Sequence, residues 1–338
     1  MRAPRFWAHD GLSSRLLTPI ASLYGRIAAG RMRQAPRYRA EVPVIVVGNY
    51  VAGGAGKTPT AIALARLAIS LGYSPVVLLR GYGGERRAPS LVDPQADRAD
   101  DVGDEALMIA RSGVPAVSAR NRRAGADLAV ACGADLIILD DGLQSPALAK
   151  DLRIAVVDAV YGIGNGKVMP AGPLRAPLAV QIEATDALLV VSNGAPGHGA
   201  DRLEQAIAGS GKPVIRADIV ADDTFRPDRP VIAFAGIGRP EKLAESLTAA
   251  GIEVADLVGF PDHYRYRDED ARQLLARAQA AGLPLVTTAK DMVRIADAIS
   301  APLADLATAA QVFEVRLTFG APEAVKALIA AHLPPPRR

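Results

Sequence analysis

Residues 42–59, with the sequence VPVIVVGNYVAGGAGKTP, combine the residue types that hold phosphate groups. Gly53, Gly54 and Gly56 carry no side chains, so successive backbone N–H groups can point into one concavity and bind phosphate oxygens. Lys57 supplies a cation for the terminal phosphates, and the hydroxyl of Thr58 is suited to Mg²⁺. This stretch therefore predicts a phosphate-binding loop.

The elements expected on either side of the loop support this interpretation. Residues 42–47 form a short apolar run rich in β-branched residues, which predicts a buried parallel strand. Residues 60–71 predict a helix whose N-terminus faces the same anion. The strict pattern G-x-x-x-x-G-K-[ST] requires glycine at Val51, so a glycine-rich turn is the alternative, but the order strand, loop, helix favours phosphate binding. The residues expected to bind the nucleotide are Val51, Ala52, Gly53, Gly54, Ala55, Gly56, Lys57 and Thr58.

A pair of acids follows another apolar run. Residues 135–139 (DLIIL) predict a buried strand, and Asp140 and Asp141 come directly after it. In a protein with a phosphate-binding loop, an acid at such a strand end is the usual source of the carboxylate that holds Mg²⁺. Two adjacent acids repel each other unless a cation joins them. The alternative is a solvated turn.

Three further residues each have two interpretations. Asp104 opens a predicted helix, where it is either a helix cap or a general base or metal ligand. His263, one of four histidines, lies in the loop FPDHYRY at 260–266 and is either solvated or catalytic. Arg120 lies near the start of a predicted helix, where a cation opposes the helix dipole, so it is expected to face a surface acid or a substrate phosphate.

Composition bounds the class of protein. The 338 residues are enough for two domains, and 50% hydrophobic with 22% charged residues indicate a globular chain. Cys132, the single cysteine, cannot form an internal disulfide and is expected to be a buried thiol in a reducing cytosol. The sequence contains no apolar run of transmembrane length and no signal peptide with a cleavage site.

The first forty residues are strongly basic, with eight arginines and one acid, Asp10, before position 40. Thr18 and Pro19 are expected to cap and open a helix. Its predicted apolar face consists of Leu16, Ile20, Leu23 and Ile27, with Arg15 and Arg26 opposite. Such a helix either lies in an anionic membrane interface or packs on the core. The arginines are Arg2, Arg5, Arg15, Arg26, Arg31, Arg33, Arg37 and Arg39.

Repeated strand–loop–helix patterns predict an α/β fold with a doubly wound parallel sheet. Strands are expected at 42–47, 74–79, 114–118, 135–139, 153–158 and 186–191, with a mobile loop at 85–101. A smaller α/β unit follows Pro227 and Pro230. Its expected elements are strands 231–235, 252–259 and 283–288 with helices 240–250 and 268–281. Residues 311–319 are expected to pair with 214–222 as a two-stranded link, before a final helix at 321–333.

These motifs together resemble one family, the tetraacyldisaccharide 4'-kinases of lipid A biosynthesis, nearly from end to end. The strings that carry the resemblance are RAPRFW, LTPIASLYG, VPVIVVGNYVAGGAGKTP, LLRGYGG, VGDEALMIA, LDDGLQ, GNGKVMPAGPLR, FAGIGRPEKL, FPDHYRY and TTAKDMVRI. The sequence departs from the common family pattern in three places: VAGGAGKTP replaces TVGGTGKTP, Ser145 replaces His after DDGLQ, and Ala176 replaces an acid after GPLR.

The resemblance implies transfer of the γ-phosphate of ATP to the 4'-hydroxyl of a lipid-linked disaccharide 1-phosphate, with Mg²⁺, in a cleft between two α/β/α domains. It implies that Asp104 takes the hydroxyl proton with the support of His263, and that Lys57 acts on ATP. Tyr82 and Arg120 are implied to contact the disaccharide. The metal set in this interpretation is Thr58, Asp140, Asp141 and Glu105.

The resemblance also implies a peripheral protein at the cytoplasmic face of the bacterial inner membrane, with its N-terminal helix toward the lipid. We expect no nucleic-acid ligand and no obligate protein partner. The expected division is a membrane-associating segment (1–40), a P-loop kinase domain (41–213), a linker strand (214–227), a smaller α/β domain (228–310), and a return strand with a C-terminal helix (311–338).

Two other functions remain as alternatives. The first is a P-loop kinase acting on a soluble metabolite, against which the basic amphipathic N-terminus argues. The second is a nucleotide-switched regulatory NTPase. Guanine selectivity usually needs an Asn-Lys-x-Asp type of loop, and the segment TAKD at 288–291 is a poor match.

Overall fold

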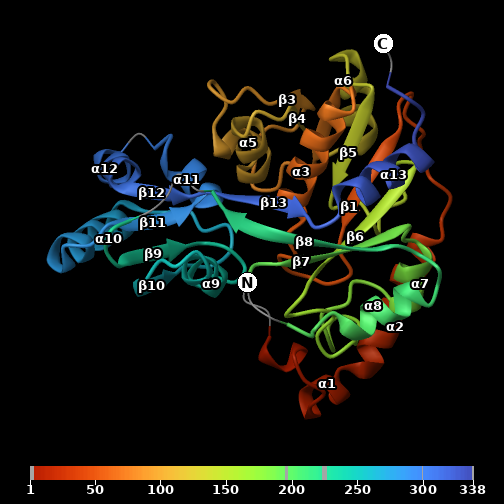
Figure 1. Cartoon of the computed structure of the whole chain (residues 1–338), viewed down its shortest axis with the longest axis horizontal. Coiled ribbons are helices and arrows are strands. Elements are labelled where there is room, and N and C mark those ends of the chain that lie inside the picture. Colours follow the sequence, from red (N-terminus) through yellow and green to blue (C-terminus); the bar gives the residue numbers. More distant parts are fainter. Residues whose placement is uncertain (1–3, 195–196, 223–226, 299, 337–338) are drawn as a thin grey trace.

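A nine-stranded sheet forms the larger part of the molecule, in the computed structural model that describes residues 4–194, 197–222, 227–298 and 300–336 (Figure 1). Its strand order is β13-β8-β7-β6-β1-β5-β2-β4-β3, and all neighbours are parallel except β13 with β8 and β3 with β4. The strands are β1 (Val44–Gly48), β2 (Pro75–Leu79), β3 (Ser90–Leu91), β4 (Ala116–Ser118), β5 (Leu136–Asp140), β6 (Leu152–Asp158), β7 (Ala187–Ser192), β8 (Val214–Ala221) and β13 (Val315–Phe319).

Helices cover both faces of this sheet, because side chains of a central strand alternate between the two faces. Ile45 and Val47 of β1 belong to the core beneath one layer of helices, and Val44 and Val46 to the core beneath the other. The predicted doubly wound α/β fold is confirmed. The first layer comprises α3 (Lys57–Ser70), α4 (Ala99–Val102), α5 (Asp104–Arg111) and α13 (Pro322–His332), and the second α6 (Arg122–Ala131), α7 (Leu178–Glu183) and α8 (Asp201–Ala208).

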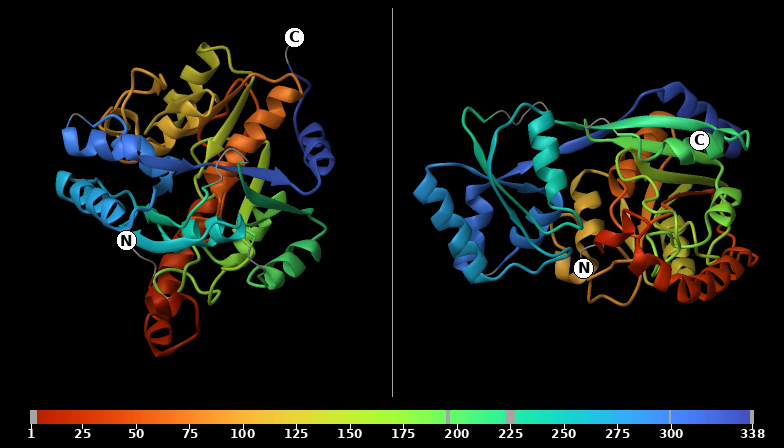
Figure 2. Two further views of the ribbon diagram at one scale, coloured as in Figure 1. Left: turned by 60° about the vertical axis from the view of Figure 1, so that its left-hand side comes forward. Right: turned by 90° about the horizontal axis from the view of Figure 1, so that it is seen from below.

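The smaller unit is a second three-layer arrangement around a four-stranded parallel sheet of order β10-β9-β11-β12. Its strands are β9 (Val231–Ala235), β10 (Val254–Gly259), β11 (Leu285–Thr288) and β12 (Ala310–Phe313). One face is covered by α9 (Glu241–Ala249) and the other by α10 (Asp268–Ala281) and α12 (Ala301–Ala309). The short helix α11 (Ala289–Ile295) follows β11 directly. Figure 2 shows the two units side by side.

The expected link between the units differs from the structure in one respect. Residues 311–319 do not form one strand, because β12 pairs with β11 in the smaller sheet and β13 pairs with β8 in the larger one. The predicted antiparallel pairing with 214–222 is confirmed by the register from Val315 with Ala221 to Phe319 with Ala217. These two strands connect the units as expected, and β8 is in addition hydrogen-bonded to β7, so the link is continuous with the larger sheet. Residues 223–226 of the predicted linker lie outside the described part of the chain.

Two other expectations are corrected. The segment 85–101 is not entirely loop, because it contains β3 and the first residues of α4, and the buried Asp97 accepts the backbone N–H of Asp93 at 2.9 Å and pairs with Arg86 at 2.7 Å. Cys132 is exposed rather than buried, since it is the C-cap residue of α6 and lies beyond the face that packs on the sheet.

The N-terminal segment packs on the larger unit through small residues. Helices α1 (Leu12–Leu16) and α2 (Thr18–Met32) cover the loop after β6, where the Ser14 hydroxyl donates to the Ala171 carbonyl at 2.8 Å. Thr18 is not a helix cap, because it lies inside α2 and its hydroxyl donates to the Ser14 carbonyl. The buried residues of α2 are Ala21, Gly25 and Ala29.

The large apolar side chains of this segment point away from the molecule. Leu16, Ile20, Leu23 and Ile27 retain 71%, 59%, 62% and 57% exposure. The predicted apolar face is therefore present and does not pack on the core of the chain. Within the described residues, no helix combines the length and apolar character needed to cross a membrane. Arg2 lies outside the described residues.

Candidate active site

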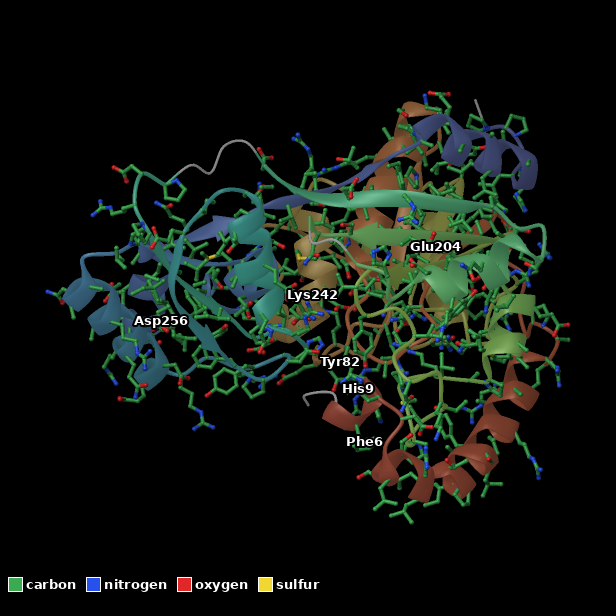
Figure 3. All side chains as sticks on the ribbon, turned by 60° about the horizontal axis from the view of Figure 1, so that its bottom comes forward. Phe6, His9, Tyr82, Glu204, Lys242 and Asp256 are labelled. Atoms are coloured by element: carbon green, nitrogen blue, oxygen red, sulfur yellow. The ribbon has the colours of Figure 1, made fainter. Side chains whose placement is uncertain are left out.

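A cavity of about 2000 Å³ lies between the two units and collects most of the predicted site residues. From the larger unit it is lined by Gly53, Gly54, Ala55, Gly56, Lys57, Thr58, Tyr82, Glu105, Arg120, Asp140 and Asp141, and from the smaller unit by Lys242, Asp262, His263 and Lys290. Figure 3 labels Tyr82 and Lys242, which lie where the two units meet.

The predicted phosphate-binding loop joins β1 to α3. Gly53 and Gly56 have φ angles of 121° and 88°, which glycine adopts without strain, and Gly56 is the N-cap of α3. The side-chain amide of Asn49 donates to the Gly53 carbonyl at 3.1 Å, and the Ala52 N–H donates to the Pro173 carbonyl at 2.8 Å. The N-terminal residues of this fourteen-residue helix line the cavity. Their backbone N–H groups have no partner within the helix and therefore favour a bound anion there.

Asp140 ends β5 beside this loop and is almost fully buried. Its Oδ2 lies 3.5 Å from the Thr58 hydroxyl, while Oδ1 is buried and accepts no hydrogen bond from any described residue. Burial and the nearby charge of Glu105 raise the pKa of Asp140 to about 7, although Lys57 opposes the shift. A buried carboxylate with an unused oxygen is suited to a cation, which would lower that pKa again.

Asp141 has a different environment. It lies 3.6 Å from the Lys57 ammonium and 2.7 Å from the Arg175 guanidinium. Burial opposes ionisation, but these two cations outweigh it and hold the pKa of Asp141 below its ordinary value. The two adjacent acids therefore differ: one is already paired with cations, and the other has an oxygen to spare. Arg122 fixes the strand end by donating to the Asp140 carbonyl at 3.0 Å.

The predicted metal residues do not form a closed cluster. Among the residues described, no three His, Cys, Asp or Glu side chains converge to hold a metal ion. Glu105 is paired with Lys290 at 2.9 Å, and Asp141 with Lys57 and Arg175. Mg²⁺ commonly binds through one or two carboxylates and substrate phosphates rather than an all-protein cage. Asp140 Oδ1 and the Thr58 hydroxyl fit that smaller requirement.

Asp104 and His263 come from different units and meet beside the cavity, which His263 lines while the buried Asp104 lies behind its wall. His263 Nδ1 lies 3.0 Å from Asp104 Oδ2. Asp104 is not the cap of α5, since Gly103 holds that position and Asp104 Oδ1 accepts the Glu105 N–H at 2.8 Å. Burial would raise the pKa of Asp104, but the hydrogen bond from His263 and the charges of Lys290 and Arg294 hold it well below its ordinary value.

Two residues of the site have strained backbones. Asp141 and His263, with φ angles of 54° and 57°, are the only non-glycine residues with positive φ in the part of the chain that the structure describes. Such conformations cost on the order of 1–3 kcal/mol and gather at functional sites. The His263 N–H donates to the Gly236 carbonyl at 3.2 Å, which helps to hold this conformation.

Tyr82 and Arg120 lie on the same wall as the acid–imidazole pair. Tyr82 is 68% exposed, and its ring centroid lies 4.9 Å from that of His263. Arg120 donates to the Gly84 carbonyl at 2.8 Å, so it orders the loop that carries Tyr82. Neither residue is needed to fill the core, and an exposed ring beside a cavity can stack on a ligand.

Several charged residues at the site were not identified from the sequence. Lys290 and Arg294 of α11 surround Asp104 and Glu105, Arg175 holds Asp141, and Lys242 donates to the Gly54 carbonyl of the phosphate-binding loop at 2.9 Å. Lys290 and Arg294 are four residues apart directly after an apolar strand, a spacing that places both on one helix face. This spacing is the sequence feature from which the two cations could have been predicted to act together.

Comparisons with known proteins agree with this geometry. The profile of the tetraacyldisaccharide-1-P 4'-kinase family matches residues 13–334. A tetraacyldisaccharide 4'-kinase of Rhodopseudomonas palustris (strain BisA53) is 52% identical over 301 residues, which is 88% of this chain and 87% of that protein. A tetraacyldisaccharide 4'-kinase of Nitrobacter winogradskyi is 45% identical over 342 residues, which is 100% of this chain and 99% of that protein.

A solved structure has the same architecture. The crystal structure of LpxK from Aquifex aeolicus in complex with ATP matches with a TM-score of 0.70 and 25% sequence identity. The match covers 95% of this chain and 99% of that one, so it includes both units and the elements between them.

The two strand-end acids predict opposite effects on stability. Because the pKa of Asp140 is raised to about 7, the folded protein keeps a proton there that the unfolded chain has lost, so stability falls as the pH rises from the unfolded-state pKa to about 7. Asp140→Asn should therefore increase the free energy of unfolding at pH 8 by roughly 1–3 kcal/mol, and this gain should shrink as the pH is lowered through 7 toward about 4. Denaturant unfolding without nucleotide or Mg²⁺ measures this difference.

Asp141→Asn is the matched control. The pKa of Asp141 is lowered, so its charge contributes stability at neutral pH that is lost only as the pH falls through its folded-state pKa. This variant should be less stable than the natural protein at pH 8. If both substitutions destabilise the protein equally at pH 8, the assignment of the unused oxygen to Asp140 is wrong.

Proposed function

The chain belongs to the tetraacyldisaccharide-1-P 4'-kinase family, and on this premise we propose that it transfers the γ-phosphate of ATP to the 4'-hydroxyl of a tetraacyldisaccharide 1-phosphate. The product is the 1,4'-bisphosphate of lipid A biosynthesis. One observation carries the proposal: a carboxylate of the larger unit and an imidazole of the smaller one, Asp104 and His263, pair at 3.0 Å beside a cavity that is lined by His263 and by the phosphate-binding loop.

ATP is held by the loop at 51–58. Its backbone N–H groups and the N-terminus of α3 bind the phosphates, and Lys57 neutralises their negative charge. Thr58 and Asp140 are the residues suited to Mg²⁺, which neutralises charge on the transferring group when bound. Asp141 keeps Lys57 in place from the other side, at 3.6 Å. Glu105 lies close enough to influence Asp140 electrostatically but is paired with Lys290.

Asp104 takes the proton of the sugar hydroxyl. Phosphoryl transfer depends chiefly on positioning and charge stabilisation, so the base has to be correctly placed rather than strongly basic. His263 holds Asp104 Oδ2 at 3.0 Å, and the low pKa keeps the carboxylate ionised and ready to accept. His263 itself lines the cavity, so it also bounds the place where the hydroxyl must lie.

The cavity is large enough for two substrates. Pockets for single small molecules measure about 300–1,000 Å³, whereas this one measures about 2000 Å³. Tyr82, beside His263, offers its ring to the face of a sugar, and Arg120 offers a cation near the disaccharide. A soluble metabolite kinase and a nucleotide-switched NTPase are less suitable, because neither accounts for the apolar surface of α1 and α2.

The N-terminal helices hold the protein at the inner surface of the bacterial inner membrane, where the acyl chains of the substrate remain. Leu12 and Leu16 of α1 and the large apolar residues of α2 form one exposed stripe. Arg31, near the end of α2, lines the cavity, so the stripe leads toward the site. Neighbouring residues of a helix differ by about 100° around its axis, so Arg15 and Arg26 flank the stripe rather than oppose it as expected.

A stripe flanked by cations suits an interfacial helix better than the predicted arrangement, in which the cations lie opposite the apolar face. Flanking cations reach lipid phosphates while the stripe enters the acyl boundary, and each well-placed cation contributes about 1 kcal/mol at an anionic surface. We therefore propose one role for each segment. Lipid is contacted by residues 1–40, ATP is held by 41–213, and His263 is supplied by 228–310. The two units are connected by 214–227 and 311–338.

Removing the base is the direct test of the proposed chemistry. Asp104→Ala should lower kcat by at least a thousandfold, since transfer then lacks its proton acceptor, while ATP affinity changes less than threefold. Phosphorylation of the purified lipid disaccharide in detergent and equilibrium binding of ATP measure the two quantities. Asp127→Ala, an exposed acid on α6, is the control. Full activity in Asp104→Ala would contradict the assignment.

Membrane association is tested by replacing the exposed stripe. The fourfold variant L16S/I20S/L23S/I27S should keep its melting temperature, because these side chains are exposed, and should bind anionic vesicles at least tenfold more weakly. Co-sedimentation with phosphatidylglycerol-containing vesicles measures this. Ile69→Ser, at an aliphatic residue on α3 that is 47% exposed, is the control. Unchanged sedimentation of the fourfold variant would exclude this surface.

A further inference from the structure

Arg294, on α11 of the smaller unit, reaches across to the carboxylate of Asp104. Its Nε donates to Asp104 Oδ2 at 2.8 Å, and its Nη2 donates to the same oxygen. Both side chains are 7% exposed. Neither Arg294 nor Asp104 is among the residues that line the cavity, and Arg294 reaches the site only through the Asp104 carboxylate.

The other end of the guanidinium is fixed within the smaller unit. Arg294 Nη1 donates to Asp291 Oδ1 and to the Gly236 carbonyl, both at 2.8 Å. Asp291 is fully buried and accepts two further hydrogen bonds at Oδ1, from the Gly236 N–H and the Tyr266 hydroxyl, each at 2.9 Å. Its Oδ2 accepts the Thr288 hydroxyl at 2.7 Å. The planar guanidinium is therefore held in one orientation by a satisfied buried network.

This arrangement decides which oxygen of Asp104 remains available. A carboxylate oxygen accepts about two hydrogen bonds, and Oδ2 already receives donors from both His263 and Arg294. Oδ1 receives only the Glu105 N–H among the described residues, at 2.8 Å. One oxygen is thus occupied, and the other keeps capacity to accept a proton.

The same helix provides a second cation. Lys290 lies four residues before Arg294, pairs with Glu105 at 2.9 Å, and lies 3.4 Å from His263 Nε2. Helix α11 therefore presents two cations to two consecutive acids at the start of α5. The contact joins the units at the catalytic carboxylate itself rather than at a distant surface.

We propose that Arg294 is a positioning residue, which orients the Asp104 carboxylate from the smaller unit and makes the base competent only when the two units are docked. The proposal rests on the proposed function, because it assumes that Asp104 is the base. Arginine is required rather than lysine, since one guanidinium must span Asp104, Asp291 and the Gly236 carbonyl at once.

The alternative is that Arg294 only stabilises the interface. The two roles differ in their effect on the pH profile. Arg294 is one of the charges that hold the pKa of Asp104 below its ordinary value, so its removal raises that pKa. The acid limb of the kcat profile then moves to higher pH, because the base becomes protonated sooner as the pH falls. A residue that only joins the units would leave this limb in place.

The experiment uses Arg294→Met, Arg294→Lys and the control Asp297→Asn. Asp297 pairs with Arg111 of α5 at 2.8 Å, so the control removes an ion pair between the same two units without touching Asp104. We expect Arg294→Met to lower kcat at least a hundredfold, to move the acid limb upward by about one pH unit or more, and to change KM for ATP less than threefold. Asp297→Asn should keep the natural pH profile.

Arg294→Lys keeps the charge and loses the planar fork. We expect a kcat about tenfold below the natural value, with the acid limb of the pH profile nearly unmoved. If Arg294→Met does not fold, the kcat of Arg294→Lys alone tests whether Arg294 is a positioning residue. Natural kcat in Arg294→Lys, or a natural pH profile in a folded Arg294→Met, would overturn the proposal. If Asp104→Ala is inactive while the Arg294 variants behave as the natural protein, only this inference fails; an active Asp104→Ala would instead remove the function on which it rests.

Discussion

The structure depends on one buried charge being neutralised from across a domain boundary. Asp104 is 7% exposed, and an ionised carboxylate at that depth is costly unless cations and hydrogen bonds surround it. The larger unit supplies only the Glu105 N–H among the described contacts, and the other partners, His263, Arg294 and Lys290, belong to the smaller unit. The carboxylate that we propose as the base is therefore stabilised as an anion by the contact between the two units. On this proposal, the residues for phosphate binding lie within one unit while the residues for proton removal are shared.

Two carboxylates near the same cavity, Asp104 behind its wall and Asp140 on it, have opposite environments. Asp104 is surrounded by donors and its pKa is lowered, whereas Asp140 is buried beside other acids, has an unused oxygen, and its pKa is raised to about 7. A pair of acids whose environments separate their pKa values indicates different tasks, by the reasoning used for other enzymes with two carboxylates. The surroundings of Asp104 fit the proposed proton acceptor, and those of Asp140 fit a carboxylate that would be paired with a cation. The role of each acid follows from its surroundings, since the residue type is the same.

The sequence predicted the parts of the site that depend on neighbours along the chain. The loop at 51–58, the strand before it and the acids after β5 follow from local patterns, because the glycines, the lysine and the strand end are close in sequence. It did not predict Arg294, which is 190 residues from Asp104, since no local pattern specifies a partner at that distance. The prediction of a single strand at 311–319 was wrong for a similar reason. Its alternation was correct, but the first half belongs to β12 in the smaller sheet and the second half to β13 in the larger one. Cys132 was assigned to the core from its Ala-rich surroundings, and only the position of the helix end shows that it is exposed.

The N-terminal helices show that an amphipathic pattern does not say which face packs. In α2 the small residues Ala21, Gly25 and Ala29 contact the protein, and a side chain added at Gly25 would lie 3.5 Å from Pro177, in ordinary contact. The large apolar residues that usually seek the core lie on the far side of the helix, more than half exposed. A helix that faced only water would not gain from exposing its large side chains and burying its small ones. Each large apolar side chain left exposed loses roughly 1.5–3 kcal/mol of the free energy that its burial would contribute. The proposed function supplies a reason, because a stripe that enters the lipid and ends near Arg31, on the cavity wall, would leave the acyl chains of the substrate in the bilayer while its sugar reaches the site beside Asp104.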